Sequence, residues 1–253
     1  MAQGRWSAST NTWGGTARPV SSDVRLRKGI ALTRSLSSSL CELLSEHPYV
    51  MPKSMQGSDE HGLYYSFMRR FRGVPWSTCL AEKPLSVNLN YLRDVSFALE
   101  FAHDKGVLHC DIRPANIICG YYGDTKLVGW TSAILLSELT AGKVTALSTW
   151  TGGDVAYMPP ELANRNFLAV GIHTDIYLLG ATLFEIITGL VAHSGQTAED
   201  TLRNACENLI LPSLQESELL RIALKAMSTN PAERHKSVRL FHDSLEAAID
   251  HIN

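Results

Sequence analysis

The chain has 253 residues, of which 45% are hydrophobic and 19% charged, and its formal net charge is −2. Such a chain can bury a sizeable core, in one large domain or two small lobes. The slightly negative charge argues against nucleic acid as a main partner, and no apolar stretch is long enough to span a bilayer. The five cysteines form no C-x-x-C pair, so we expect neither a disulfide framework nor a zinc site. This cysteine usage favours location in the reducing cytoplasm.

The first part of the chain predicts a small, sheet-rich lobe with one helix. Residues 1–23 are rich in Ser, Thr, Gly and Ala without a period, and we expect a loose entry segment there. Residues 24–33 have strand character, and leucines recur at helical spacing over residues 36–44. Residues 62–70 are again typical of a strand because of their aromatic side chains.

Charge is distributed unevenly along the chain. Basic residues outnumber acidic ones in residues 1–76, and acidic residues outnumber basic ones after that. Two differently charged solvated faces explain this pattern. The alternative is a docking surface for a protein partner around Arg69, Arg70 and Arg72.

From about residue 80 the pattern becomes helical. Apolar residues over 89–102 form one stripe, which ends near Gly106, a residue suited to cap a helix. Residues 176–187 are apolar on most faces, which is typical of a helix buried in the middle of a domain. Residues 219–227 and 238–249 predict further amphipathic helices.

Four motifs follow one another at suitable spacing in this second part. They are H-C-D-I-R-P-A-N at 109–116, Y-M-P-P-E at 157–161, D-I-Y-L-L-G at 175–180 and P-A-E-R at 231–234. They are similar to the catalytic loop, the end of the activation segment, the start of the central helix and a late arginine motif of protein kinases. The chain thus resembles a bacterial Ser/Thr protein kinase domain of the Asp-Trp-Gly subtype over roughly residues 30–250.

The resemblance implies an α+β fold with two lobes, as in protein kinases. A small antiparallel β-sheet lobe is expected over residues 24–72, after the loose segment 1–23. A larger, mainly α-helical lobe is expected over residues 73–253.

Five residues have expected roles that are structural. By resemblance, Glu161 pairs with Arg234 and ties the activation segment to the second lobe. Asp175 holds the backbone of the catalytic loop. His109 and Trp130 pack in a hydrophobic column. These roles explain why the motifs can persist without catalysis.

The resemblance also assigns catalytic and cofactor-binding positions. Asp111 is the best candidate base if any chemistry survives, but its retention for hydrogen bonding within the loop is the favoured interpretation, because the metal site is missing. Asn116 is the recognised metal ligand and Arg113 stands where kinases carry lysine, keeping the charge but changing its geometry. Met68, at the back of the nucleotide pocket, and Phe71, in the hinge, are expected to serve packing rather than specificity.

Several positions depart from the kinase pattern. Gly129 replaces the aspartate that binds magnesium, which leaves Asn116 as a weak metal ligand because a hard dication prefers carboxylates. Thr33 falls at the position of the phosphate-binding lysine, and Ser38 falls where its glutamate partner should be. Cys110 replaces the arginine that would read an activation-loop phosphate.

Two further departures concern the phosphates and the base. The sole candidate for a glycine-rich loop, W-G-G-T at 13–16, is degenerate. Asp154 replaces the threonine that usually supports the catalytic aspartate, so a second carboxylate is expected near Asp111, with repulsion between the two.

These departures predict a catalytically impaired pseudokinase that acts as a regulatory or binding module. We expect a protein partner, which is a kinase, a kinase substrate or another signalling protein. We also expect at most weak ATP binding and doubt that the chain binds magnesium. The alternative is an active ATP-dependent Ser/Thr protein kinase with an atypical site built on Asp111, Asn116 and Arg113. A small-molecule phosphotransferase is disfavoured, because the motifs at 157–161 and 175–180 belong to the peptide-substrate architecture of protein kinases.

Overall fold

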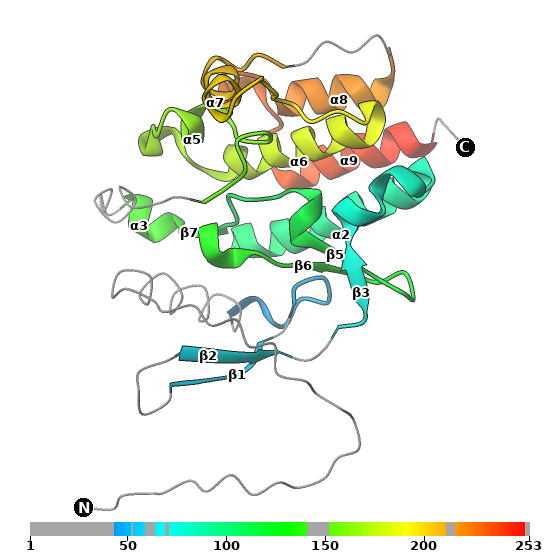
Figure 1. Cartoon of the computed structure of the whole chain (residues 1–253), viewed down its shortest axis with the longest axis vertical. Helices are drawn as coiled ribbons and strands as arrows, with labels where there is room; N and C mark the ends of the chain where they lie inside the picture. The colour runs from blue at the N-terminus through cyan, green and yellow to red at the C-terminus, as the bar shows by residue number, and fades with distance from the viewer. Residues whose placement is uncertain are drawn as a thin grey trace, which may run out of the picture.

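A computed structural model describes residues 43–51, 53–58, 64–68, 71–140, 152–210 and 216–250 of the chain. The predictions for residues 1–33, and those for Thr33 and Ser38, lie outside the described residues. Leu43 and Leu44 are helical and the helix ends there, before His47, as the proline that follows predicts. Figure 1 shows short strands on one side of a larger, mainly helical part.

The first sheet is an antiparallel pair. Strand β1 (Lys53–Ser58) pairs with β2 (Tyr64–Met68), with an irregularity in register between Lys53 and Met55. The strand predicted within residues 62–70 is therefore confirmed. The sequence predicts a small antiparallel sheet followed by a larger helical part, and the structure has both.

Two further small sheets lie within the helical part and were not predicted. One has the strand order β3-β5-β6, and the other pairs β4 with β7, all antiparallel. In the first, Val74 lies opposite Cys119, which brings the segment after residue 71 against the strand that leaves the catalytic loop. The bounds are β3 (Gly73–Pro75), β4 (Val107–Leu108), β5 (Ile117–Gly120), β6 (Thr125–Leu127) and β7 (Ile134–Leu135).

The long helices agree with the periodicity of the sequence. Helix α2 (Leu85–Asp104) ends just before Gly106, whose φ of 72° lies in the left-handed region that glycine tolerates. Helix α6 (Ile172–Thr188) ends in the same way at Gly189, with φ 71°. The other helices are α3 (Leu136–Thr140), α5 (Pro160–Ala163), α7 (Ala198–Glu207), α8 (Glu218–Ala226) and α9 (Val238–Asp250).

Short 3-10 turns connect these elements along the chain. They are η1 (Trp76–Thr78), η2 (Leu80–Glu82), η3 (Pro114–Asn116), η4 (Trp130–Ser132), η5 (Phe167–Ala169) and η6 (Pro231–Glu233).

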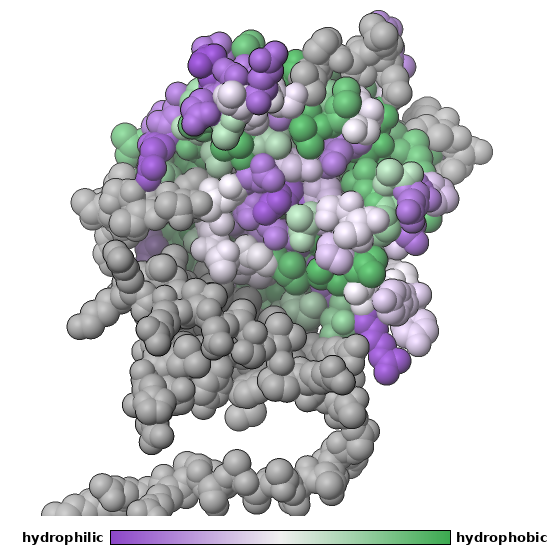
Figure 2. All heavy atoms as spheres, in the orientation of Figure 1, coloured by the Kyte–Doolittle hydropathy of each residue, from purple (hydrophilic) through white to green (hydrophobic). Residues whose placement is uncertain are grey.

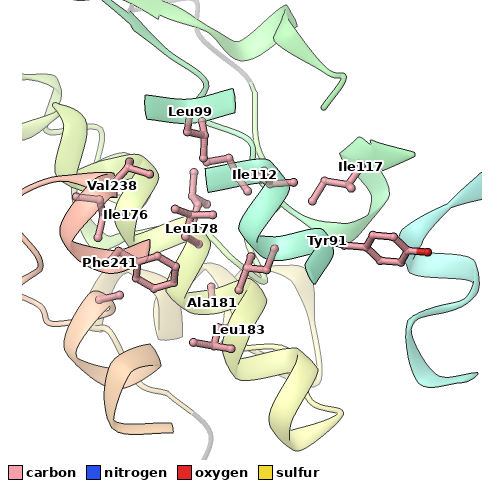
Figure 3. Packing of buried hydrophobic residues seen from close by; sticks show 14 of the residues in the cluster. Tyr91, Leu99, Ile112, Ile117, Ile176, Leu178, Ala181, Leu183, Val238 and Phe241 are labelled. Carbon is pink, nitrogen blue, oxygen red and sulfur yellow. The ribbon is translucent and has the colours of Figure 1, made fainter. Parts of the chain in front are cut away.

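Helix α6 runs through the middle of the core. Figure 3 shows Leu99 of α2, Leu178 of α6 and Phe241 of α9 in one cluster, and each is at most 3% exposed. Burying a side chain of this size contributes roughly 1.5–3 kcal/mol. Gly180 allows α8 to pack closely, because a Cβ added there would lie 2.6 Å from the Cβ of Ala226.

The outer face of the molecule is mixed in character. Figure 2 shows hydrophilic and hydrophobic side chains interspersed over the helical part. Among the described helices, none combines the length and the apolar character that crossing a membrane requires.

His235 is a buried histidine that lies just after η6. The residue is 4% exposed, its ring packs edge-on against Phe241 at 5.4 Å between centroids, and its Nδ1 has no hydrogen-bond partner. Burial, with a smaller contribution from the charge of Lys225, lowers the pKa of His235 from 6.5 to about 4. The folded chain therefore holds this imidazole neutral.

We expect this histidine to make the folded state sensitive to acid. Its folded pKa lies below the unfolded value, so its contribution is complete above about pH 6.5 and is lost as the pH falls to about 4. His235→Phe, which keeps a ring but cannot titrate, should flatten the fall in Tm between pH 6.5 and 4.5. Phe241→Leu, which perturbs the same contact, should lower Tm and leave the slope unchanged; equal slopes in all three proteins would contradict the prediction.

Candidate functional site

The catalytic-loop motif is anchored to helix α6 by one buried carboxylate. Asp175 accepts hydrogen bonds from the backbone N–H groups of His109 and Cys110, each at 2.8 Å, and its Oδ2 also lies 2.8 Å from Nε2 of His103. Burial raises the pKa of Asp175, but the hydrogen bond and charge of His103 outweigh it, so the pKa is lowered and the carboxylate stays ionised. Cys110 adopts a left-handed φ of 61° at this point.

His109 and Trp130 lie against each other behind the loop. Their rings meet edge-to-face with centroids 4.5 Å apart, and both residues are buried. Nε2 of His109 lies 2.9 Å from the carbonyl oxygen of Val128, one residue before Gly129. Burial lowers the pKa of His109, which favours the neutral ring in this apolar setting.

The carboxylate of Asp111 is occupied by side chains of its own loop. Arg113 donates through Nε to Oδ1 at 3.1 Å, and Asn116 donates through Nδ2 to Oδ2 at 2.8 Å. The same Nδ2 lies 2.7 Å from the backbone carbonyl oxygen of Asp111. Both carboxylate oxygens thus have side-chain partners within the loop itself.

Arg113 also joins the loop to the activation segment. Its NH1 group donates to Oδ2 of Asp154 at 3.1 Å, while Oδ1 of Asp154 accepts from the backbone N–H of Ala156. The guanidinium therefore lies between the carboxylates of Asp111 and Asp154. The repulsion expected between these two carboxylates is offset, because one cation serves both.

Gly129 leaves no carboxylate where a kinase would bind metal. Its φ is 87°, and a Cβ added there would lie 2.6 Å from Cγ of Asn116 and 2.7 Å from its Oδ1. The amide of Asn116 therefore fills the space that a side chain at 129 would need. Within the described residues, no group of three or more His, Cys, Asp or Glu side chains is placed to hold a metal ion.

The described residues offer magnesium a single amide ligand, and they include only part of the expected nucleotide contacts. One amide oxygen, on Asn116, does not make a magnesium site, since the ion prefers several hard oxygen ligands in octahedral geometry. Of the expected nucleotide contacts, Phe71 lies beneath Lys126, whose Nζ is 5.6 Å from the ring centroid. Met68 ends strand β2, and Thr33 lies outside the described residues.

Glu161 and Arg234 form a buried, two-point ion pair. NH1 of Arg234 lies 2.7 Å from Oε1 of Glu161, and NH2 lies 2.9 Å from Oε2. Arg234 also donates to the carbonyl oxygens of Ser228 and His173. The guanidinium also stacks over the ring of Tyr177. This buried and extensively hydrogen-bonded pair joins α5 to the turn before α9.

The structure adds a contact that sequence reasoning missed. The hydroxyl of Tyr157 donates to Oε2 of Glu185 at 2.6 Å, across 28 residues of chain. Burial raises the pKa of Glu185, and the negative charge of Asp154 adds to the rise, against the hydrogen bond from Tyr157. Glu185 could have been singled out from the sequence as the one charge in the apolar stretch of α6.

Comparison with known proteins gives one family. The family model described as protein kinase domain matches residues 71–245. Serine/threonine-protein kinase PrkC of Bacillus subtilis is 29% identical, covering 81% of this chain and 32% of its own length. Tyrosine-protein kinase MasK of Myxococcus xanthus is 30% identical; the match covers 79% of this chain and 33% of MasK. Serine/threonine-protein kinase PknD of Chlamydia trachomatis is 25% identical; the match covers 79% of this chain and 25% of PknD. The chain thus spans about a quarter to a third of the length of these relatives.

The buried ion pair gives a test of what holds the activation segment in place. We expect Arg234→Met to destabilise the chain by about 3–5 kcal/mol, because it leaves the buried carboxylate of Glu161 uncompensated. The matched control is Arg203→Met, which removes an exposed pair with Asp200 and should cost less than about 1 kcal/mol. Urea unfolding measures both, and similar losses for the two variants would overturn the assignment.

Proposed function

This chain belongs to the protein kinase domain family, and we propose that it is a pseudokinase: a member that binds and regulates rather than transfers phosphate. Its fold is the two-lobed kinase fold. The observation that carries the proposal is the pairing of a fully engaged Asp111 with the absence of a carboxylate at Gly129. Phosphoryl transfer depends on positioned charge and metal, so a chain that lacks them lacks most of the means of catalysis.

The size of the expected loss supports this proposal. Removing a single preorganised charge-stabilising group typically costs about 10²–10³ in rate. The lysine position falls on Thr33, the metal-binding aspartate is Gly129, and the glycine-rich loop is degenerate. These losses are not additive, but nothing in the described site compensates for any of them.

What the chain retains supports a binding role. The contacts of Asp175, Glu161 and Arg234 keep the activation segment and the catalytic loop in place without nucleotide or metal. A chain held together in this way can bind a protein partner, either another kinase or a protein that kinases modify. The cleft can keep a weak nucleotide site that does not require magnesium.

A phosphotransfer assay tests the proposal directly. We expect the purified chain with ATP and magnesium to transfer no more γ-phosphate to itself or to a generic protein substrate than Asp111→Ala does. The proposal fails if the unmodified chain labels either target and Asp111→Ala abolishes that labelling. Thermal shift with ATP and ADP, with and without magnesium, then separates a pure scaffold from a nucleotide-binding pseudokinase.

The second candidate is an active Ser/Thr protein kinase with an atypical site. The observation in its favour is the contact of Arg113 with both Asp111 and Asp154, which places a cation beside the candidate base. Stabilisation by ATP that strictly requires magnesium, together with labelling that depends on Asp111, would favour this reading.

Restoring the missing carboxylate alone should not restore activity. We expect Gly129→Asp to gain no phosphotransfer and to lower Tm, because its Cβ meets Asn116 and its φ of 87° is strained for a side chain. Gly123→Asp is the matched control: its φ is 88°, and a Cβ there has nothing within 4 Å. The loss of Tm at position 129 beyond that at position 123 therefore measures the clash with Asn116. If Gly129→Asp alone produced phosphotransfer activity, the proposed loss of the phosphate-binding lysine and its glutamate partner in the first lobe would be refuted.

A further inference from the structure

A cavity lies beside the β3–β5 pairing, away from Asp111 and the activation segment. Its volume is about 370 Å³, and backbone of the β5–β6 hairpin forms part of its wall. Tyr91 of α2 lies at the edge of the residues labelled in Figure 3, with its ring pointing away from the others, and it also lines this cavity. The lining side chains that matter below are Cys79, Lys83 and Cys119.

Two cysteines meet at this wall from distant parts of the sequence. Cys79 lies between η1 and η2 and is 8% exposed, while Cys119 lies in β5 and is 3% exposed. The two side chains lie close enough for Cys79 to influence the ionisation of Cys119. Both are free thiols and both line the cavity, so a small solute that enters it meets the pair together.

The two thiols differ in their surroundings. Burial, followed by the proximity of Cys79, raises the pKa of Cys119 to about 12, against the opposing charge of Lys83. Cys119 is therefore held as a thiol. Cys79 is the more exposed of the two, at 8% against 3%, so a solute in the cavity reaches its sulfur more readily.

We propose that Cys79 and Cys119 are a redox modification site that closes to a reversible disulfide when a peroxide enters the cavity. The Cys79 thiolate attacks one peroxide oxygen, which breaks the O–O bond and gives a sulfenic acid and, after protonation, water. The Cys119 sulfur then attacks the sulfenic sulfur, and its proton leaves with the departing hydroxyl as a second water. Two thiols and one peroxide thus give one disulfide and two waters.

The bridge has a definite mechanical effect. It would tie the turn after β3 to β5, three residues beyond Asn116, and close a long loop of chain. Such a loop loses conformational freedom in the unfolded state, so the oxidised chain should be the more stable one. A disulfide of this kind in a reducing compartment is transient and regulatory. The inference does not depend on whether the chain transfers phosphate.

Peptide mapping of the full chain tests the proposal. After treatment with hydrogen peroxide and blocking of free thiols, a digest with trypsin and an Asp-specific protease separates Cys79, Cys110 and Cys119 onto different peptides. We expect a linked pair that contains Cys79 and Cys119, a loss of two free thiols per chain, and a rise in Tm of roughly 5–10 °C. Dithiothreitol should reverse all three changes.

Variants fix the order of events. Cys119→Ala should leave Cys79 as a sulfenic acid that dimedone captures, whereas Cys79→Ala should leave Cys119 unmodified. Cys206→Ala, on helix α7, should bridge as the unmodified chain does. Over-oxidation of Cys79 without a bridge, a bridge to any other cysteine, or oxidation confined to Cys206 would each overturn the proposal.

Discussion

The carboxylate of Asp175 is the interaction on which the rest of the site depends. It sits inside the core on α6, with no exposed surface, and bonds two successive backbone N–H groups of the catalytic loop. Charge-assisted bonds of this kind are roughly twice as strong as neutral ones. Helix α6 is also the helix around which α2, α8 and α9 pack. The loop is therefore bonded directly to the central helix of the core. The contacts that set the backbone geometry of the loop thus come from the protein itself.

The chain keeps what stabilises it and departs from the kinase pattern where charge would act on phosphate. Removing either partner of the Glu161–Arg234 pair leaves a buried charge without a partner. The resulting loss in free energy of unfolding is large for a marginally stable protein. Replacing the metal-binding aspartate by Gly129 carries no such cost, since Asn116 occupies the space. Arg113 likewise finds carboxylate partners without any ligand. Folding and catalysis thus place separable demands on neighbouring residues.

Periodicity in the sequence predicted the long elements well, and Gly106 predicted the end of α2. It could not predict β3, β5 and β6, because strands of three or four residues are too short to show alternation. The family motifs located Asp111, Asn116 and Gly129. They could not reveal that Arg113 reaches Asp154, 41 residues away, or that Tyr157 reaches Glu185, since such contacts arise only from tertiary packing.

Cys110 has a consequence for how such a module can carry information. A modification or ligand shifts a conformational equilibrium only as far as it interacts differently with the two states. With a small buried thiol in place of a cation, position 110 offers a phosphate on the activation segment no charge to bind, and Arg113 of the same loop is already paired with Asp111 and Asp154. If the chain acts as the binding module proposed above, phosphorylation of the activation segment is therefore not expected to switch it through position 110.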